Sequence, residues 1–149
     1  MIGTLLALAL ASNSFLPDRT VPTYMAAAHC GGKNISPELH WSGAPAGTQS
    51  YALIVHDPDA PIPGGFYHWV LYDIPSTQSE IQVNAGRGYR GPCPPPGKVH
   101  HYRFTLYALD VKNIGAAGLD AKQLLARMRG HILAQTSLVG LYEINRPRS

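Results

Sequence analysis

The residues best suited to chemistry are aspartates and histidines at the ends of apolar runs. Asp57 and Asp59 belong to the motif Asp-Pro-Asp-Ala-Pro at positions 57–61, which directly follows the apolar run Tyr51–His56. The two prolines of this motif disfavour helical backbone in the residue before each of them, so the motif is held extended. On spacing alone, the pattern is typical of a turn in which each aspartate caps its own backbone.

Two histidines point to a binding site instead. His68 begins the apolar run His68–Ile74, and His100 begins the run His100–Leu109. Histidine donates hydrogen bonds and can carry positive charge near neutral pH, and a neighbouring carboxylate favours the charged form. With the hydroxyl of Tyr102, these groups could bind a phosphate or a carboxylate. The alternative is that His100 is a hydrogen-bonded core residue.

The strand predicted at His100–Leu109 would position these groups. Alternate residues of a strand point to opposite faces, and one face of this strand is the more apolar. That face carries His100, Tyr102, Phe104, Leu106 and Ala108, whereas the other carries His101, Arg103, Thr105 and Tyr107. We therefore expect His100 at the end of a row that faces the core.

Further strands are predicted at Tyr51–His56, His68–Ile74 and Leu138–Ile144, with a short edge segment at Thr77–Val83. Residues 13–50 are interrupted by four prolines and are expected to be irregular. The Gly- and Pro-rich residues 86–98 predict a stiff loop, either a pocket wall or a plain connection. The apolar residues 1–11 predict a first buried strand, with an atypical secretion signal as the alternative.

One helix is predicted near the C-terminus. Asp120 is a suitable N-cap, and Gln123 can complete a capping box with it. Apolar residues then recur at helical spacing within Ala121–Gln135, at Ala121, Leu124, Leu125, Met128 and Ile132. This pattern is typical of a helix that packs on a sheet, and we expect no catalytic role for it.

Composition excludes several classes of protein. The 149 residues predict one domain, 1–149, and 45% hydrophobic with 14% charged residues exclude bulk disorder. Scattered Lys and Arg residues and a net charge of +3 argue against nucleic-acid binding. Residues 1–11 are too short to span a membrane. Cys30 and Cys93 lack the spacing of a metal-binding pair, and they either form one disulfide or remain two buried thiols.

An ordered set of motifs, between about Ser12 and Tyr142, resembles the phosphatidylethanolamine-binding protein family. The likeness is to its short bacterial and archaeal branch, the Raf kinase inhibitor-like proteins. The matching segments are Asn34–Trp41, Asp57–Pro61, His68–Val70 with Asp73–Pro75, Gly91–Pro95, His100–Tyr102, Gly130–Ala134 and Leu138–Gly140.

The resemblance implies a mainly β protein, a Greek-key β-sandwich with one C-terminal helix and few short helices. It implies a small anion pocket for phosphate-type groups, including the phosphoryl head of phosphatidylethanolamine. The site residues carried over are Asp57, Asp59, His68, His100 and Tyr102, with Gly91 and Pro92 as the loop wall. The expected function is binding without catalysis, metal or cofactor. We also expect a homodimer by analogy, no nucleic-acid partner and a cytoplasmic location, or a periplasmic or secreted one if residues 1–11 are a signal.

Two alternatives to simple binding are compatible with the sequence. Relatives regulate kinases or inhibit proteases, so this chain could act by protein contact. A hydrolase could use the His/Asp cluster, or Cys93 with His100 as nucleophile and base. However, no zinc-enzyme motif is present, and no third group is evident to orient the Cys93 pair.

The chain departs from the family pattern beside the second histidine. His101 stands where the family usually has arginine, and Arg90 stands where glycine is common. Arginine offers a permanent charge and a bidentate fork, which neutral histidine lacks. We therefore expect weaker or more pH-dependent anion binding, partly offset by Arg90. A phosphate titration of the natural chain against His101→Arg at two pH values tests this expectation.

Overall fold

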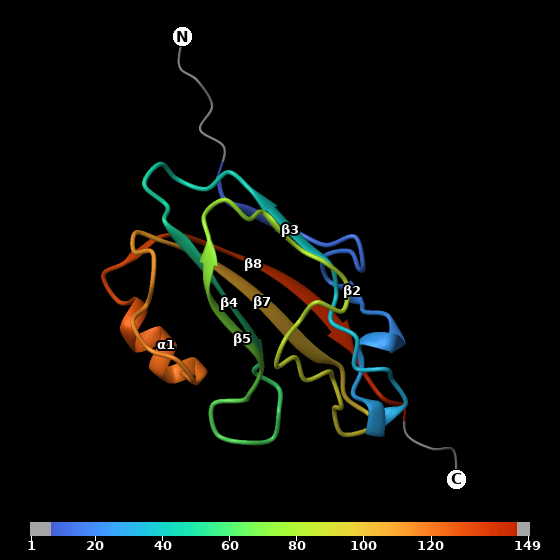
Figure 1. The fold of residues 1–149 in the computed structure, drawn as a ribbon. Helices are drawn as coiled ribbons and strands as arrows, with labels where there is room; N and C mark the ends of the chain where they lie inside the picture. Colours follow the sequence, from blue (N-terminus) through green and yellow to red (C-terminus); the bar gives the residue numbers. More distant parts are fainter. Residues whose placement is uncertain (1–6, 146–149) are drawn as a thin grey trace.

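Two β-sheets packed face to face, with one helix on the outside, form the molecule (Figure 1). The computed structural model describes residues 7–145. The small sheet has the order β1-β3-β6, and the larger sheet has the order β2-β8-β7-β4-β5. The elements are β1 (Ala9–Ala11), β2 (Arg19–Thr20), η1 (Thr23–Met25), η2 (Ala28–Cys30), β3 (Leu39–Ser42), β4 (Ser50–Asp57), β5 (Phe66–Pro75), β6 (Glu80–Ile81), β7 (His100–Leu109), α1 (Ala121–Met128) and β8 (Ile132–Tyr142).

The main core lies between the two sheets. The small sheet contributes Leu10, Leu39 and Trp41, and the larger sheet contributes alternate residues of β4 and β7. On β7 these are Tyr102, Phe104, Leu106 and Ala108, as the alternation predicts. The apolar face of the predicted strand is therefore the face that closes the sandwich.

A second core lies on the outer face of the larger sheet, under α1. Tyr107 and Leu109 of β7 pack there with Leu124 and Met128 of the helix. The sequence pattern indicated that the Tyr107 face was the polar one. It is polar only near the start of β7, where His101 and Arg103 are exposed, because the helix covers the second half.

The helix is shorter than predicted. It begins as expected, with the side chain of Asp120 accepting the N–H of Gln123 and the side chain of Gln123 accepting the N–H of Asp120. It ends at Met128, and Gly130 then adopts a left-handed conformation with φ of 78°. Ile132, predicted on the helix, pairs with Leu109 as the first residue of β8. Pairing along β7 outweighs the helical spacing of these residues.

Other element boundaries also differ from expectation. The final strand starts six residues earlier than predicted, and the edge segment shrinks to the two residues of β6. Residues 13–50 hold β2, β3 and two short 3-10 helices rather than only irregular chain. The predicted N-terminal strand forms at Ala9–Ala11, whereas residues 1–6 lie outside the described residues. The predicted fold class, a mainly β sandwich with one C-terminal helix, is confirmed.

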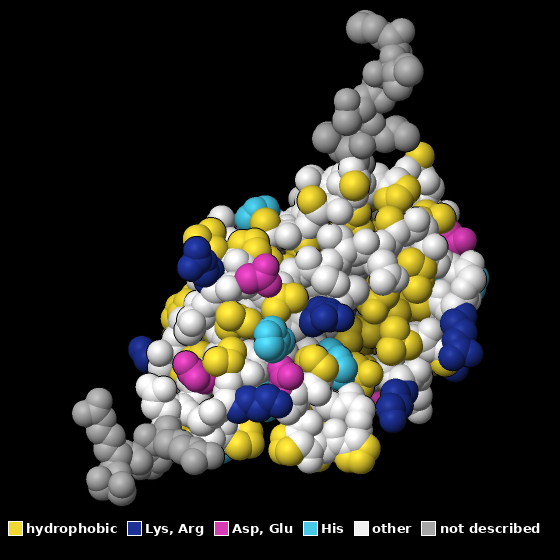
Figure 2. Space-filling model, turned by 180° about the vertical axis from the view of Figure 1, so that it is seen from behind, with side chains coloured by type: hydrophobic (Ala, Val, Ile, Leu, Met, Phe, Trp, Pro, Cys, Tyr) yellow, Lys and Arg dark blue, Asp and Glu magenta, His cyan; other side chains and the backbone are white. Residues whose placement is uncertain are grey.

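Within residues 7–145, no helix is long and apolar enough to cross a membrane. On the face shown in Figure 2, the Lys and Arg side chains stand apart from one another. This face therefore lacks the dense basic stripe that nucleic-acid binding requires.

Candidate ligand-binding site

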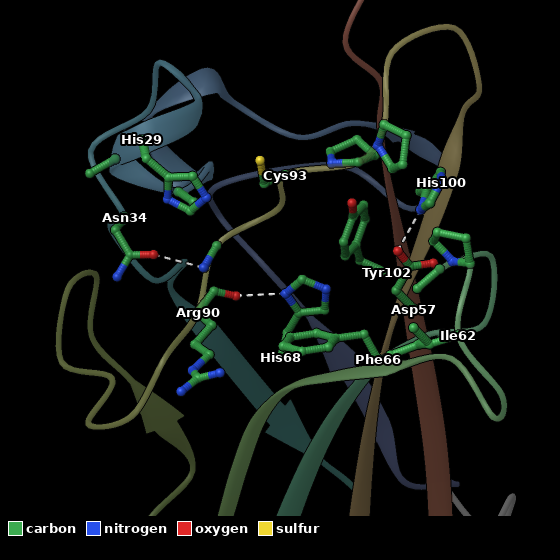
Figure 3. Close-up of a pocket in the computed structure, with 17 residues that line it drawn as sticks. His29, Asn34, Asp57, Ile62, Phe66, His68, Arg90, Cys93, His100 and Tyr102 are labelled. Carbon is green, nitrogen blue, oxygen red and sulfur yellow. Dashed lines mark hydrogen bonds and ion pairs between the residues drawn. The ribbon is translucent and has the colours of Figure 1, made fainter.

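A cavity of about 700 Å³ opens where the end of β4 meets the starts of β5 and β7. Because these neighbouring strands are antiparallel, the end of β4 and the starts of β5 and β7 lie at the same end of the larger sheet. The segment around η2 and the Gly- and Pro-rich loop complete the walls (Figure 3). The apolar lining residues include Ala27, Ala28, Ala60, Pro61, Ile62, Phe66, Pro94 and Pro95.

Asp57 and His100 form a buried pair in this cavity. The Nδ1–H of His100 donates to Oδ2 of Asp57 at 2.5 Å, and each residue is only 2% exposed. The other carboxylate oxygen, Oδ1, accepts the backbone N–H of Asp59 at 2.8 Å. Asp57 is thus held in place, and it fixes the orientation of the imidazole. Among the described residues, no side chain or backbone group bonds the Nε2 of His100, which leaves that atom for a ligand.

Tyr102 brings a hydroxyl to the same cavity. Its side chain is buried, and the hydroxyl has no hydrogen-bond partner among the described residues. Burial, followed by the negative charge of Asp57, raises the pKa of Tyr102 far above its usual value. The hydroxyl therefore stays protonated and can donate a hydrogen bond. An unpaired buried hydroxyl destabilises the fold, so its position calls for an explanation.

The ring of His68 packs edge to face against the ring of Tyr102, with centroids 5.1 Å apart, and both rings line the cavity. Its Nδ1 lies 2.8 Å from the carbonyl oxygen of Arg90, so we assign the proton to Nδ1. Burial lowers the pKa of His68, although the Arg90 carbonyl opposes this shift. His68 is therefore neutral at pH 7, and its Nε2 is an acceptor. It donates to an anion only after protonation, which is a narrower role than the sequence suggested.

Asp59 and His101 lie outside the cavity lining, at its rim. Oδ2 of Asp59 accepts the backbone N–H of His101 at 2.8 Å and its Nδ1–H at 2.7 Å. Burial opposes any lowering, but these hydrogen bonds lower the pKa of Asp59 below its usual value. In this chain, the residue at the family's arginine position is therefore engaged with Asp59.

Hydrogen bonds join the loop wall to the residues on both sides of η2. The N–H of Gly91 donates to Oδ1 of Asn34 at 2.7 Å, and the N–H of Ala27 donates to the carbonyl of Pro92 at 2.9 Å. A Cβ on Gly91 would lie 2.2 Å from the carbonyl oxygen of Met25, so only glycine fits. Gly91 lines the cavity, whereas Pro92 supports it from behind.

The two cysteines join the same two walls. Cys30 and Cys93 form a disulfide with Cα atoms 5.7 Å apart, 63 positions apart in sequence. Of the two possibilities that the sequence leaves open, the structure has the disulfide. The pairing engages the Cys93 sulfur, which one of the enzymatic alternatives would need as a nucleophile.

Five of the seven predicted site residues line one cavity: Asp57, His68, Gly91, His100 and Tyr102. The lining residues that the sequence did not single out include His29, Asn34 and Phe66. Phe66 could have been found, because it precedes His68 by two positions and shares its face of β5. Nothing in the spacing places His29 or Asn34 beside β7, since η2 and the loop come together only in the folded chain.

Comparison with known proteins agrees with this architecture. Residues 11–143 match the family model described as phosphatidylethanolamine-binding protein. A UPF0098 protein of Aquifex aeolicus is 44% identical over 133 residues, covering 76% of this chain and 77% of the relative. A protein of Mycobacterium tuberculosis named as a candidate lipoprotein, LppC, is 38% identical, covering 91% of this chain and 72% of the relative.

A solved structure is also similar. The crystal structure of Escherichia coli YbcL, titled a member of the mammalian PEBP family, superposes with a TM-score of 0.89 at 31% identity. The superposition covers 94% of this chain and 100% of the YbcL chain. The chain therefore belongs to the phosphatidylethanolamine-binding protein family.

Proposed function

We propose that this protein binds a small phosphate-type group in the cavity formed by Asp57, His68, His100 and Tyr102. The observation that carries the proposal is the hydroxyl of Tyr102, which is buried without a partner next to the Asp57–His100 pair. A ligand oxygen at this point would accept the hydroxyl hydrogen, and it would lie beside the Nε2 of His100, which no described residue bonds. Such an oxygen would supply the hydrogen-bond partner that the buried hydroxyl of Tyr102 lacks, and would remove the energetic cost of leaving it unpaired.

The cavity lining supports an organic ligand with a phosphoryl group. Proline, isoleucine and phenylalanine side chains surround the few polar atoms, and the exposed side chain of Arg90 is also part of the wall. Sites of this kind bind the apolar part of a ligand by contact and orient it by a few polar groups. A phospholipid head group and a phosphorylated small molecule share this chemistry.

Binding without turnover is part of the proposal. The Asp57–His100 pair orients an imidazole, but the Cys93 sulfur is bonded to Cys30. Tyr102 does not replace it as a nucleophile, because its raised pKa disfavours the phenolate. No cofactor is needed for this role. A protein partner and a homodimer stay predictions.

The disulfide bears on the compartment. The sequence favours the cytoplasm, with the periplasm or the exterior as the alternative. Disulfides persist in oxidising compartments, and one relative is named as a candidate lipoprotein. We therefore propose the alternative, a location outside the cytoplasm. Alkylation of free thiols in whole cells tests it, because protein labelled at Cys30 and Cys93 would contradict it.

Calorimetric titration with inorganic phosphate and with phosphoethanolamine tests the binding proposal. Both should bind the natural chain, and tighter binding of phosphoethanolamine would indicate a head-group ligand. His100→Ala should abolish binding of both while the circular dichroism spectrum is retained. Binding that persists in folded His100→Ala would show that the site is assigned wrongly.

Two tyrosine variants separate binding from stability. Tyr102→Phe should weaken phosphate binding by about tenfold, since a hydrogen bond to a charged oxygen is lost. Its free energy of unfolding should not fall, because the hydroxyl has no protein partner. Tyr89→Phe is the control: its hydroxyl donates to the carbonyl of Met25 at 2.8 Å. That variant should lose about 1 kcal/mol of stability and bind phosphate as before. Equal affinity of Tyr102→Phe and the natural chain would argue against the proposal.

A further inference from the structure

A second cluster of ligating side chains lies at the cavity wall, away from the Asp57–His100 pair. A ring nitrogen of His29 and the sulfurs of Cys30 and Cys93 all lie within 4.8 Å of one another. His29 and Cys93 both line the cavity, one from η2 and the other from the Gly- and Pro-rich loop (Figure 3). Tetrahedral zinc with two sulfur ligands and one nitrogen ligand needs these atoms about 3.4–3.8 Å apart. In the oxidised chain the two sulfurs are bonded to each other, so they would have to move apart to this spacing once the disulfide is reduced.

Hydrogen bonds hold the two walls together independently of the disulfide. The N–H of Ala27 donates to the carbonyl of Pro92 at 2.9 Å, and the hydroxyl of Tyr89 donates to the carbonyl of Met25 at 2.8 Å. Asn34 adds two more bonds, accepting from the N–H of Gly91 and donating to the carbonyl of Tyr89. Cleavage of the sulfur–sulfur bond would therefore leave two thiols facing each other beside His29. Because the walls that carry the ligands are already held together, little further ordering of the chain is needed to bind a metal.

From this arrangement we propose that the reduced chain binds one Zn²⁺ ion through His29, Cys30 and Cys93. A dithiol reductant gives two electrons and two protons to the Cys30–Cys93 bond and leaves as its own disulfide. The two thiols then bind Zn²⁺ as thiolates and release two protons. Thiolate and imidazole are ligands that Zn²⁺ prefers, and three protein ligands leave a fourth position for water or for an oxygen in the cavity.

The cluster thus has two exclusive states, a disulfide under oxidising conditions and a zinc site under reducing ones. The chain has only two cysteines, so any thiolate ligand must come from this pair. The proposal does not depend on phosphate binding, because neither His100 nor Tyr102 belongs to the cluster.

Cobalt titration tests the proposal, because Co²⁺ takes the same ligands and its bonds to sulfur absorb light. The full chain is reduced with a dithiol, freed of reductant without oxygen, and titrated with Co²⁺ and then Zn²⁺. We expect a sulfur-to-cobalt charge-transfer band that saturates at one equivalent and disappears on addition of Zn²⁺. The oxidised chain should show no such band. Absence of the band in the reduced chain would overturn the proposal, as would loss of the fold on reduction.

Two histidine variants test the third ligand. His29→Ala keeps both thiols, and it should weaken Zn²⁺ binding by about tenfold or more because one of three ligands is lost. The control is His131→Ala, since His131 is also solvent-accessible but is paired with Asp110 at 2.8 Å. This control should bind as the natural chain does. Equal affinity of His29→Ala and the natural chain would remove His29 from the site and contradict the proposed ligand set.

Discussion

At the scale of single residues, each polar group of the cavity is either fixed by the protein or left for a ligand. Asp57 is satisfied by His100 and by the backbone of Asp59, whereas the hydroxyl of Tyr102 is not satisfied. Buried polar groups normally have partners, because desolvation without a hydrogen bond is costly. This contrast is the basis on which we propose Asp57 as a positioning residue and Tyr102 as a ligand-contacting one.

The buried histidine gives a pH dependence of stability. The pKa of His68 is lowered in the folded state, so the unfolded chain, with a histidine pKa of about 6.5, takes up a proton first. Between the two pKa values the unfolded state holds more protons, and stability is therefore lost as the pH falls below about 6.5. We expect His68→Asn, whose amide can still donate to the Arg90 carbonyl, to lose less stability over this range.

Urea unfolding between pH 7.5 and 5 measures this difference. His40→Asn is the control, because the His40 side chain is 43% exposed and paired with Glu38 at the surface. Its stability should change with pH much as that of the natural chain does. Parallel curves for His68→Asn and the natural chain would contradict the assignment of a neutral, buried His68.

At the scale of elements, the site arises from pairing rather than from any one segment. Asp57 ends β4, and its antiparallel neighbours place Phe66 of β5 and the start of β7 beside it. The helix makes no contact with this cavity, since α1 packs on the outer face of the larger sheet. Changes at α1 should therefore alter stability without altering binding.

The capping box at α1 tests that separation. Asp120→Ala removes the acceptor of the Gln123 N–H, a 2.8 Å bond, and should cost about 1 kcal/mol of stability. Asp120→Asn keeps an acceptor at the N-cap and should cost much less. Urea unfolding measures both, and phosphate affinity should stay the same in both variants. A change in affinity with Asp120→Ala would show that α1 is coupled to the cavity.

At the scale of the whole molecule, two apolar cores share one sheet. Phe104 and Leu106 of β7 pack in the core between the sheets, whereas Tyr107 and Leu109 pack in the core under α1. Both cores therefore depend on the position of β7, and we expect their stabilities to be coupled. The single domain expected over residues 1–149 stays a prediction.

Unfolding of the oxidised chain should therefore be a single cooperative transition. Trp41 and Trp69 both belong to the core between the sheets, so their fluorescence reports on that core. Far-ultraviolet circular dichroism follows the whole backbone, including α1. The two probes should give coincident denaturation curves. An earlier transition in circular dichroism than in fluorescence would show that the helix and its core unfold separately.

The sequence by itself determined the strands at Tyr51–His56 and His100–Leu109, the start of the helix at Asp120 and the inward face of His100. These features depend on local spacing, on alternation and on capping residues, which act over a few positions. The family resemblance, carried by ordered motifs, brought Asp57, His68 and His100 into one predicted site.

Only the tertiary structure decided which of these groups pair with each other and which remain free. The helix ends at Met128 because the following residues pair with β7 as β8. The Nε2 of His68 is a hydrogen-bond acceptor because its Nδ1–H donates to the carbonyl of Arg90. Cys30 and Cys93 lie 63 positions apart, and no periodicity relates them. Contacts of this range depend on the packing of the whole chain, so a sequence pattern of a few residues cannot specify them.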